Sequence, residues 1–206
     1  MSILKELVFT PKCLGCKRLG VAYCNTCIEK IQPFRARDLL ELDSCFCASE
    51  YSGWIRDSII RYKNGDAKYA EPLSKLLRKT LEELDVSGNL IVVPIPSSQL
   101  KIRERGFNTI ANLCTHLTHE CDSLKLDTSN LFLRRPVIDQ VGLSAAQRLA
   151  NLDGVFGVHR VINGTVVIVD DVVTTGATLN SAARILRYAG AQRVFGLALC
   201  GTPKTR

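Results

Sequence analysis

The stretch that most constrains the fold is residues 166–179, which read VVIVDDVVTTGATL. It begins with an apolar β-branched run, residues 166–169, which is typical of a strand buried on both faces. Two adjacent carboxylates, Asp170 and Asp171, follow this run, and a two-valine step leads to a hydroxyl-rich turn, residues 174–178. Apolar residues then recur at helical spacing up to a predicted stop at Gly190.

A buried strand, two acids and a small turn that opens a helix together predict an anion site. The turn offers backbone N–H groups, threonine hydroxyls and the positive end of the helix dipole to a phosphate. The acids are expected in the same crevice, beyond the carboxyl end of the strand, where open α/β sheets bind ligands. The acid pair alone leaves another interpretation open, an ordinary strand–turn–helix with solvated acids and capping threonines.

The full string closely resembles the phosphoribosyl pyrophosphate (PRPP) binding motif of the type I phosphoribosyltransferases. In that motif an apolar strand precedes two acids, two spacer residues and Thr-Thr-Gly-x-Thr. The resemblance implies that Asp170 and Asp171 hydrogen-bond to the ribose hydroxyls and that the turn holds the 5′-phosphate. The expected PRPP-binding residues after the acids are Val172, Val173, Thr174, Thr175, Gly176, Ala177 and Thr178.

Length and composition indicate one substantial core with a small appendage. The chain has 206 residues, of which 46% are hydrophobic and 23% charged, and no apolar run approaches membrane-spanning length. The start does not resemble a secretory signal, so a cytoplasmic protein without membrane insertion is expected. The net charge of +7 suits phosphorylated ligands or nucleic acid but decides little.

Four of the nine cysteines form two CxxC pairs, and these are Cys13, Cys16, Cys24 and Cys27. Two such pairs can place four thiolates around one tetrahedral ion, so residues 1–43 are predicted to be a structural zinc module. Disulfides are disfavoured without an export signal, and a redox CxxC needs only one pair. A closed four-thiolate site would stabilise the fold rather than catalyse. The remaining five cysteines are expected in the core.

Residues 44–206 are expected to form the main domain. A strand at residues 89–94 leads through Pro94-Ile95-Pro96 to two serines, and helices are predicted near 52–63 and 68–84. Lys63 is either solvated or directed at the ligand crevice. Lys101, Arg103 and Arg105 precede a helix that begins near Phe107, and they either offset pyrophosphate charge or form a surface turn. Residues 122–153 are predicted to be a long basic loop, which suits a lid over an anion.

A second resemblance extends over nearly the whole chain. The strings PIPSSQLKIRERGFN and YKNGDAKYAEPL, the series from Arg134 through Arg148 to Phe156, the acid-pair motif and the paired-CxxC module occur in the same order in the ComF family. These are the competence protein F-like, or amidophosphoribosyltransferase-like, proteins. Two positions depart from the family pattern, Thr109 and Ala177, and neither removes a loop N–H group.

The ComF resemblance implies an α/β fold of the type I phosphoribosyltransferase class, a mostly parallel sheet flanked by helices. It implies a pyrophosphate loop, often with a cis peptide in relatives, and Mg²⁺ that bridges pyrophosphate and ribose. It also implies cations for the departing pyrophosphate. The expected pyrophosphate loop is Ile95, Pro96, Ser97 and Ser98, and the expected cations are Arg103, Arg105 and Arg148.

Two functions remain open at this stage. Either the chain transfers phosphoribosyl to an unknown acceptor, or it binds a phosphoribosyl ligand without turnover. The family resemblance points to single-stranded DNA and competence proteins as partners in DNA uptake. Because aromatic residues make up only 6% of the chain and no basic–aromatic stripe occurs, the sequence itself supports DNA binding only weakly. The oligomeric state stays open.

Overall fold

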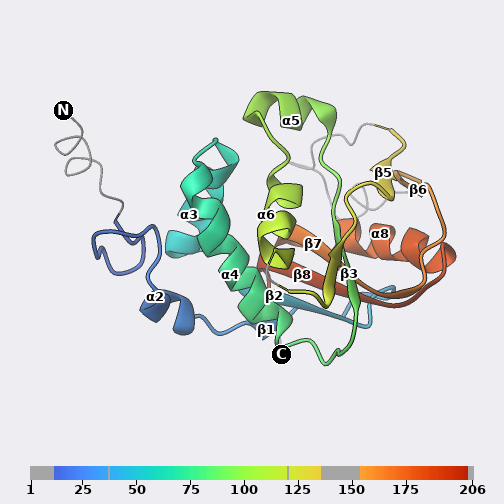
Figure 1. Cartoon of the computed structure of the whole chain (residues 1–206), viewed down its shortest axis with the longest axis horizontal. Helices are drawn as coiled ribbons and strands as arrows, with labels where there is room; N and C mark the ends of the chain where they lie inside the picture. The colour runs from blue at the N-terminus through green and yellow to red at the C-terminus, as the bar shows by residue number, and fades with distance from the viewer. Residues whose placement is uncertain (1–11, 37, 120, 136–153, 204–206) are drawn as a thin grey trace.

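The computed structural model describes residues 12–36, 38–119, 121–135 and 154–203, and the fold is built around one mostly parallel sheet (Figure 1). The strands are β1 (Phe34–Arg35), β2 (Ser44–Glu50), β3 (Leu90–Pro94), β4 (Leu124–Leu126), β5 (Leu131–Leu133), β6 (Phe156–Val158), β7 (Gly164–Val173) and β8 (Ala191–Gly201). The helices are α2 (Asn25–Glu29), α3 (Gly53–Lys63), the 3-10 turn η1 (Ala67–Tyr69), α4 (Ala70–Leu81), α5 (Gln99–Arg105), α6 (Thr109–Thr118) and α8 (Ala177–Tyr188).

The main sheet has six strands in the order β1-β2-β8-β7-β3-β4. All its pairings are parallel except that of β1 with β2, which is antiparallel. β7 lies in the middle, and its residues 166–169 are completely buried. This arrangement confirms the predicted mixed α/β class with a mostly parallel sheet. It also places the carboxyl ends of β2, β3, β7 and β8 along one edge.

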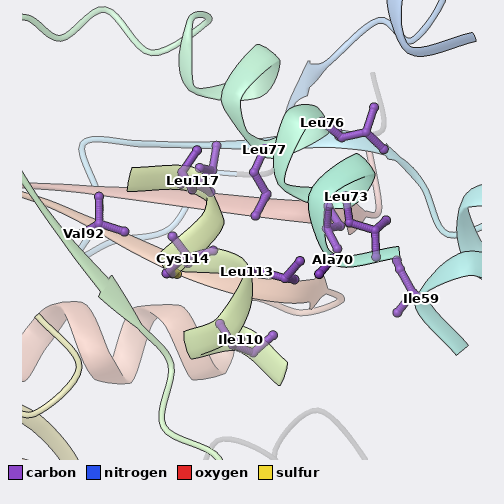
Figure 2. Close-up of a cluster of buried hydrophobic side chains, with 14 of the residues drawn as sticks. Ile59, Ala70, Leu73, Leu76, Leu77, Val92, Ile110, Leu113, Cys114 and Leu117 are labelled. Carbon is purple, nitrogen blue, oxygen red and sulfur yellow. The ribbon is translucent and has the colours of Figure 1, made fainter. Parts of the chain in front are cut away.

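One face of the sheet is covered by α3, α4 and α6. Figure 2 shows the cluster on this side, where leucines from α4 and α6 meet Val92 of β3 and Ile59 of α3. The leucines of α4 recur at helical spacing, so the helix buries one continuous stripe. Leu73, Leu76 and Leu77 are fully buried there.

The other face is covered by α8 and by the two-stranded sheet of β5 and β6. Leu179, Ala182, Ala183 and Leu186 of α8 pack against Val166 and Ile168 of β7. Because neighbouring residues of β7 are buried in opposite clusters, the strand has no solvated face, as its uninterrupted apolar sequence predicts.

The cysteine-containing segment, here called the cysteine module (residues 12–30), lies to one side of the sheet in Figure 1. Residues 34–35, which also precede the predicted boundary at 43/44, form β1 of the main sheet. The division into residues 1–43 and 44–206 stays a prediction.

Two segments differ from what the sequence suggested. The Lys101–Arg105 stretch is the helix α5 rather than a turn, because Ser98 caps its first turn and Gly106, with φ +81°, ends it. Residues 124–126 and 131–133, expected in a long loop, are strands.

Candidate functional site

The acid pair lies where one neighbour of β7 ends. β3 stops at Pro94, which pairs with Val169, whereas β8 continues alongside β7 as far as Val173. The strand therefore does not end at the acids, as the sequence suggested, but beyond Val169 it has lost its partner on the β3 side. Asp170 and Asp171 occupy this first stretch beyond the end of β3.

Burial and the adjacent carboxylate make Asp170 hard to ionise. Desolvation and the charge of Asp171 raise the pKa of Asp170 from the ordinary 3.8 to about 7, and the cations of Lys63 and Lys101 act in the opposite direction. The backbone N–H of Asp171 donates to Asp170 Oδ1 over 2.8 Å. The pair is thus a half-buried acceptor set whose charge depends on nearby cations.

Lys63 is one of those cations, and it is directed at the crevice. Its Nζ lies 2.6 Å from Asp171 Oδ2, and the two side chains are only 27% and 18% exposed. Lys63 is the last residue of α3, which packs on the face of the sheet opposite to α8. The sequence left its orientation open, and the ion pair decides it.

The turn after the acids leads directly into α8. Gly176 is the N-cap residue of this helix, with φ +75°, a conformation that glycine adopts without strain, and it has no side chain with which to cap the first turn. Thr175 Oγ1 accepts a hydrogen bond from the Ala177 N–H over 3.4 Å. A Cβ at Gly176 would lie 2.4 Å from Cδ2 of Leu39, so the β1–β2 connection packs directly on the turn.

The predicted pyrophosphate loop follows β3 at the same edge. The Ile95 N–H still donates to Val169 O over 2.9 Å, and Ile95 is buried. Ser98 Oγ accepts from the Lys101 N–H over 3.3 Å, so its hydroxyl also serves as the helix cap of α5. The described residues contain no cis peptide bond, so the cis form expected from relatives is absent from this loop.

The helical form of α5 separates the two arginines that the sequence grouped. Residues two apart on a helix point to nearly opposite sides, whereas residues four apart share a face. Arg105 lines a cavity of about 520 Å³ together with Lys63, Asn64, Ile60 and Glu104. Its Nη1 also donates to Thr109 Oγ1 over 3.3 Å. Arg103 is exposed, and Lys101 acts on Asp170.

Arg148 lies outside the described residues, as do residues 136–153 in general. The residues on either side of that segment are described. β5 pairs with β6, and the Arg134 N–H donates to Val155 O over 2.8 Å. Gly157 permits this pairing to be close, because a Cβ there would lie 2.6 Å from the ring of Phe132.

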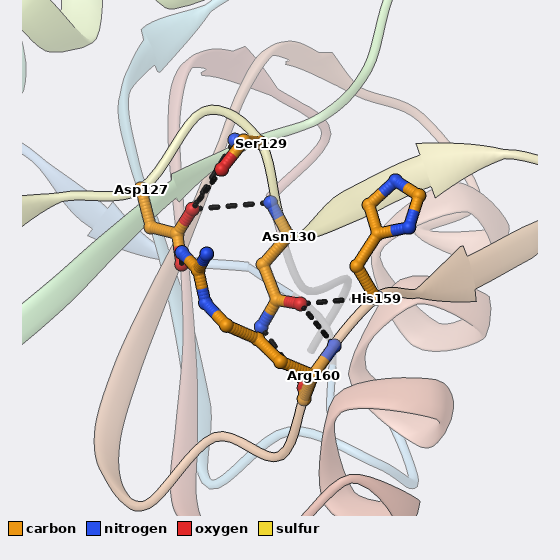
Figure 3. Close-up of polar contacts among 5 residues, drawn as sticks. All are labelled: Asp127, Ser129, Asn130, His159 and Arg160. Carbon is orange, nitrogen blue, oxygen red and sulfur yellow. Dashed lines mark hydrogen bonds and ion pairs between the residues drawn. The ribbon is translucent and has the colours of Figure 1, made fainter.

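A polar network ties this β5–β6 ribbon to the loop after β4 (Figure 3). The buried Asn130 accepts from the His159 and Arg160 N–H groups and donates to Arg160 O over 3.2 Å. Asp127 binds the backbone of Ser129 and Asn130 and pairs with Arg160 Nη2 at 2.8 Å. The base from which residues 136–153 depart is therefore held by side chains as well as by strand pairing.

The four paired cysteines meet at one point. Their Sγ atoms all lie within 4.8 Å of one another, and Cys24 Sγ is 3.9 Å from Cys13 Sγ and 3.5 Å from Cys16 Sγ. Four ligands about 2.3 Å from a tetrahedral zinc would be about 3.8 Å apart, so the donor set fits such an ion. Burial raises the pKa of Cys13, but N–H groups of Cys16, Cys24 and Gly15 outweigh it and lower the value to about 6.

Gly15 is required by this close packing. A Cβ at this position would lie 2.7 Å from Cys27 Sγ. Cys45 and Cys47, by contrast, are buried in β2 within the core, as the sequence predicted, and Cys114 and Cys200 are buried as well. Cys121, which was also expected in the core, is only partly buried.

Sequence reasoning did not assign Lys101 separately from the arginines, and it missed Leu39. The i, i+4 spacing of Lys101 and Arg105 could have identified the former once a helix was considered. No local signal marks Leu39, because its role depends on the packing of a distant loop.

None of the helices in the described part of the chain has the length and apolarity that crossing a membrane requires.

Comparison with known proteins agrees with the motif. Residues 137–206 match the family model described as "Phosphoribosyl transferase domain". The chain is 36% identical to "DNA utilization protein YhgH" of Escherichia coli (strain K12), over 87% of this chain and 78% of that protein. It is 28% identical to "Competence protein ComFC" of Bacillus subtilis (strain 168), over 82% and 68%.

A solved structure described as "Structure of the allosteric regulatory enzyme of purine biosynthesis" is 22% identical, with a TM-score of 0.40. The match covers 63% of this chain and 26% of that chain, so the chain spans about a quarter of that enzyme.

Proposed function

Because the chain belongs to the ComF family, whose main domain has the type I phosphoribosyltransferase fold, we propose that it binds PRPP or a related 5′-phosphoribosyl ligand together with Mg²⁺. The observation that carries the proposal is the position of the acid pair. Asp170 and Asp171 follow the end of β3 on a central strand and precede the N-terminus of α8, whose N-cap residue is a glycine, by a few residues. A phosphoribosyl ligand has its ribose hydroxyls and its 5′-phosphate a short distance apart. The acids would match the hydroxyls, and the turn before α8 would match the phosphate.

Each part of the ligand has a proposed partner. The turn of residues 174–178 would donate N–H and hydroxyl groups to the 5′-phosphate, and the acids would accept from the ribose hydroxyls. Residues 95–98, with Lys101 and Arg105, would face the pyrophosphate. Carboxylate oxygens suit Mg²⁺, so Asp170 and Asp171 would lie beside the ion, which when bound would reduce the charge of the departing pyrophosphate.

The proposal extends to transfer of the phosphoribosyl group to a nitrogen acceptor. The bond between C1 and the pyrophosphate oxygen would break, a bond between C1 and nitrogen would form, and the nitrogen would lose a proton. Such a step requires positioning and stabilisation of charge more than a protein nucleophile. The absence of a Ser/His/Asp set from the motif is therefore consistent with it.

A second candidate is a phosphoribosyl-binding protein that handles single-stranded DNA without turnover. The names of the relatives, "DNA utilization protein" and "Competence protein ComFC", favour this function, and so does the net charge of +7. Under both candidates the cysteine module would hold a structural Zn²⁺, and the protein would work in the cytoplasm with competence proteins.

Calorimetry with PRPP and Mg²⁺ tests the site. The double variant Asp170→Asn/Asp171→Asn is expected to lose binding, because neutral amides accept weaker hydrogen bonds from the ribose hydroxyls. Asp57→Asn, an exposed aspartate on α3, serves as the matched control. Unchanged affinity in the double variant would refute the site.

Two further measurements separate the candidates. Pyrophosphate release across a panel of nucleobases and amines supports transfer, and its absence throughout the panel favours the binding protein. Titration with single-stranded DNA should give an affinity that falls steeply with salt if phosphates are contacted. No binding at low salt argues against the DNA-handling function.

A further inference from the structure

Helix α3 extends from the cysteine module to the acid pair, Asp170 and Asp171. Its first half contacts the cysteine module, and its last residue, Lys63, holds Asp171 at 2.6 Å. Eleven residues at 1.5 Å each make it a rod of about 16 Å. Because a helix of this length is stiff, a displacement of one end is expected to shift the other end.

The contact with the module is made by Tyr23, the residue before Cys24. Its ring packs edge-on against Trp54, with centroids 4.7 Å apart, and lies 6.2 Å from the ring of Tyr69. Its hydroxyl donates to Ser58 Oγ, and Ser58 Oγ is within hydrogen-bond distance of Trp54 O. Tyr23 is 5% exposed and Ser58 is completely buried, so this contact is shielded from solvent.

The far half of α3 is fixed as firmly. Ile59 and Tyr62 are about 1% exposed, and the Tyr62 hydroxyl lies 2.7 Å from Asn112 Oδ1 on α6. The backbone N–H of Asn64, which caps the helix, lies 3.0 Å from Ile60 O. Lys63 consequently leaves the helix in one direction, toward the acid pair and the cavity that it lines with Arg105.

The charge at Lys63 matters because two carboxylates are adjacent there. A phosphoribosyl pyrophosphate would bring several more negative charges to the same place. Bringing these charges together without a fixed cation is unfavourable in a partly desolvated crevice. The position of Lys63 should therefore influence how well the crevice accepts an anion.

We infer that α3 couples the cysteine module to the phosphoribosyl site, with Lys63 as the positioning residue at its end. The module fixes the first half of the helix through Tyr23, and the helix presents the Lys63 ammonium group to Asp171. The inference rests on the proposed phosphoribosyl function for its consequence in binding. The coupling between the two ends of α3 does not need the ligand, so it can be tested in the ligand-free protein.

The binding test uses PRPP with Mg²⁺ and four variants of the full chain. Lys63→Met is expected to weaken binding about tenfold through loss of a charge-assisted contact, whereas Lys68→Met, an exposed lysine paired with Asp66, should leave it unchanged. Tyr23→Phe is expected to weaken binding severalfold, whereas Tyr51→Phe, an exposed tyrosine just before α3, should not.

The decisive comparison is Tyr23→Phe in the Lys63→Met background. If the module acts through Lys63, Tyr23→Phe has no further effect there, whereas effects of independent distant sites add. An equal loss in both backgrounds, or no loss in either, overturns the inference. Ser58→Ala, which removes the acceptor of the same contact, repeats the test if Tyr23→Phe folds poorly.

Hydrogen exchange of the ligand-free protein tests the link separately. Tyr23→Phe should speed exchange at residues 61–65, at the far end of α3, and Tyr51→Phe should not. Faster exchange confined to residues 52–58 would show that the module is only a local support and would overturn the coupling. If wild-type protein fails to bind PRPP, the proposed function falls, and this exchange experiment still decides whether α3 couples the two ends.

Discussion

Asp170 shows at the scale of one residue how a proposed binding group lowers the stability of its own fold. We propose that it accepts from ribose hydroxyl groups, but its burial beside Asp171 raises its pKa to about 7. A carboxyl group with a raised folded-state pKa binds a proton on folding, so stability decreases as pH rises through the window between the two pKa values. That window extends here from 3.8 to about 7.

Asp170→Asn is therefore expected to stabilise the ligand-free protein on the order of 2 kcal/mol above pH 7, because the amide stays neutral where the carboxylate must ionise. The gain should shrink as pH falls and disappear near pH 4. Urea unfolding at several pH values measures it, with Asp57→Asn as the exposed control. A gain that is independent of pH would contradict the assigned cause.

The elements that surround the site differ in how they are held. α8 and β7 are held by the burial of apolar side chains, which the pattern of their own sequences predicts. The β5–β6 ribbon is short, with three residues in each strand, and relies on the side chains of Asn130 and Asp127. A polar network of this kind is strong only when each member is satisfied.

Asn130→Ala is expected to destabilise the protein by about 1–2 kcal/mol, because it removes a buried amide that accepts from the partly buried N–H groups of His159 and Arg160. The His159 N–H keeps the backbone oxygen of residue 130 as an acceptor. Asn163→Ala, which removes an exposed amide paired with Gln192, should cost less than about 0.5 kcal/mol. Chemical denaturation of both variants compares them. Equal losses would mean that the ribbon is held by its strand pairing alone.

The whole molecule combines a large apolar core with a cysteine module whose described helix, α2, buries no residue. The module is ordered by its contacts with the main domain, among them Tyr23 on α3 and the Lys79 ammonium group on Glu29 O, and we expect metal ligation to add to this order. The main sheet has a buried cluster on each face, and Ala22 and Tyr23 of the module belong to one of them.

We expect one zinc per chain, lost in Cys16→Ser and retained in Cys121→Ser, whose thiol lies outside the cluster beside Ser123. Loss of the metal should lower the thermal midpoint by several degrees while most secondary structure persists, because most members of both apolar clusters lie on the sheet and its flanking helices. Metal analysis and circular dichroism check these results. Full unfolding of Cys16→Ser would show that the module supports the entire fold.

The sequence by itself determined the features that depend on local pattern. The sequence predicted a buried strand at residues 166–169, the convergence of the four CxxC cysteines, and a shared buried face for Cys45 and Cys47, and the structure has all three. The acid pair and the turn into α8 were adjacent in the chain, so their proximity required no knowledge of the fold. The resemblance to known families then supplied the expected ligand.

Only the tertiary structure decided how distant segments meet at the acid pair. Lys63 lies more than one hundred residues before Asp171, and Leu39 contacts Gly176 across a similar separation. The helical form of α5, which removes Arg103 from the side shared by Lys101 and Arg105, depends on a cap and a left-handed glycine. VVIVDDVVTTGATL thus predicts an anion-binding turn, but long-range packing decides which cations lie around it, because those contacts leave no periodic signal in the sequence.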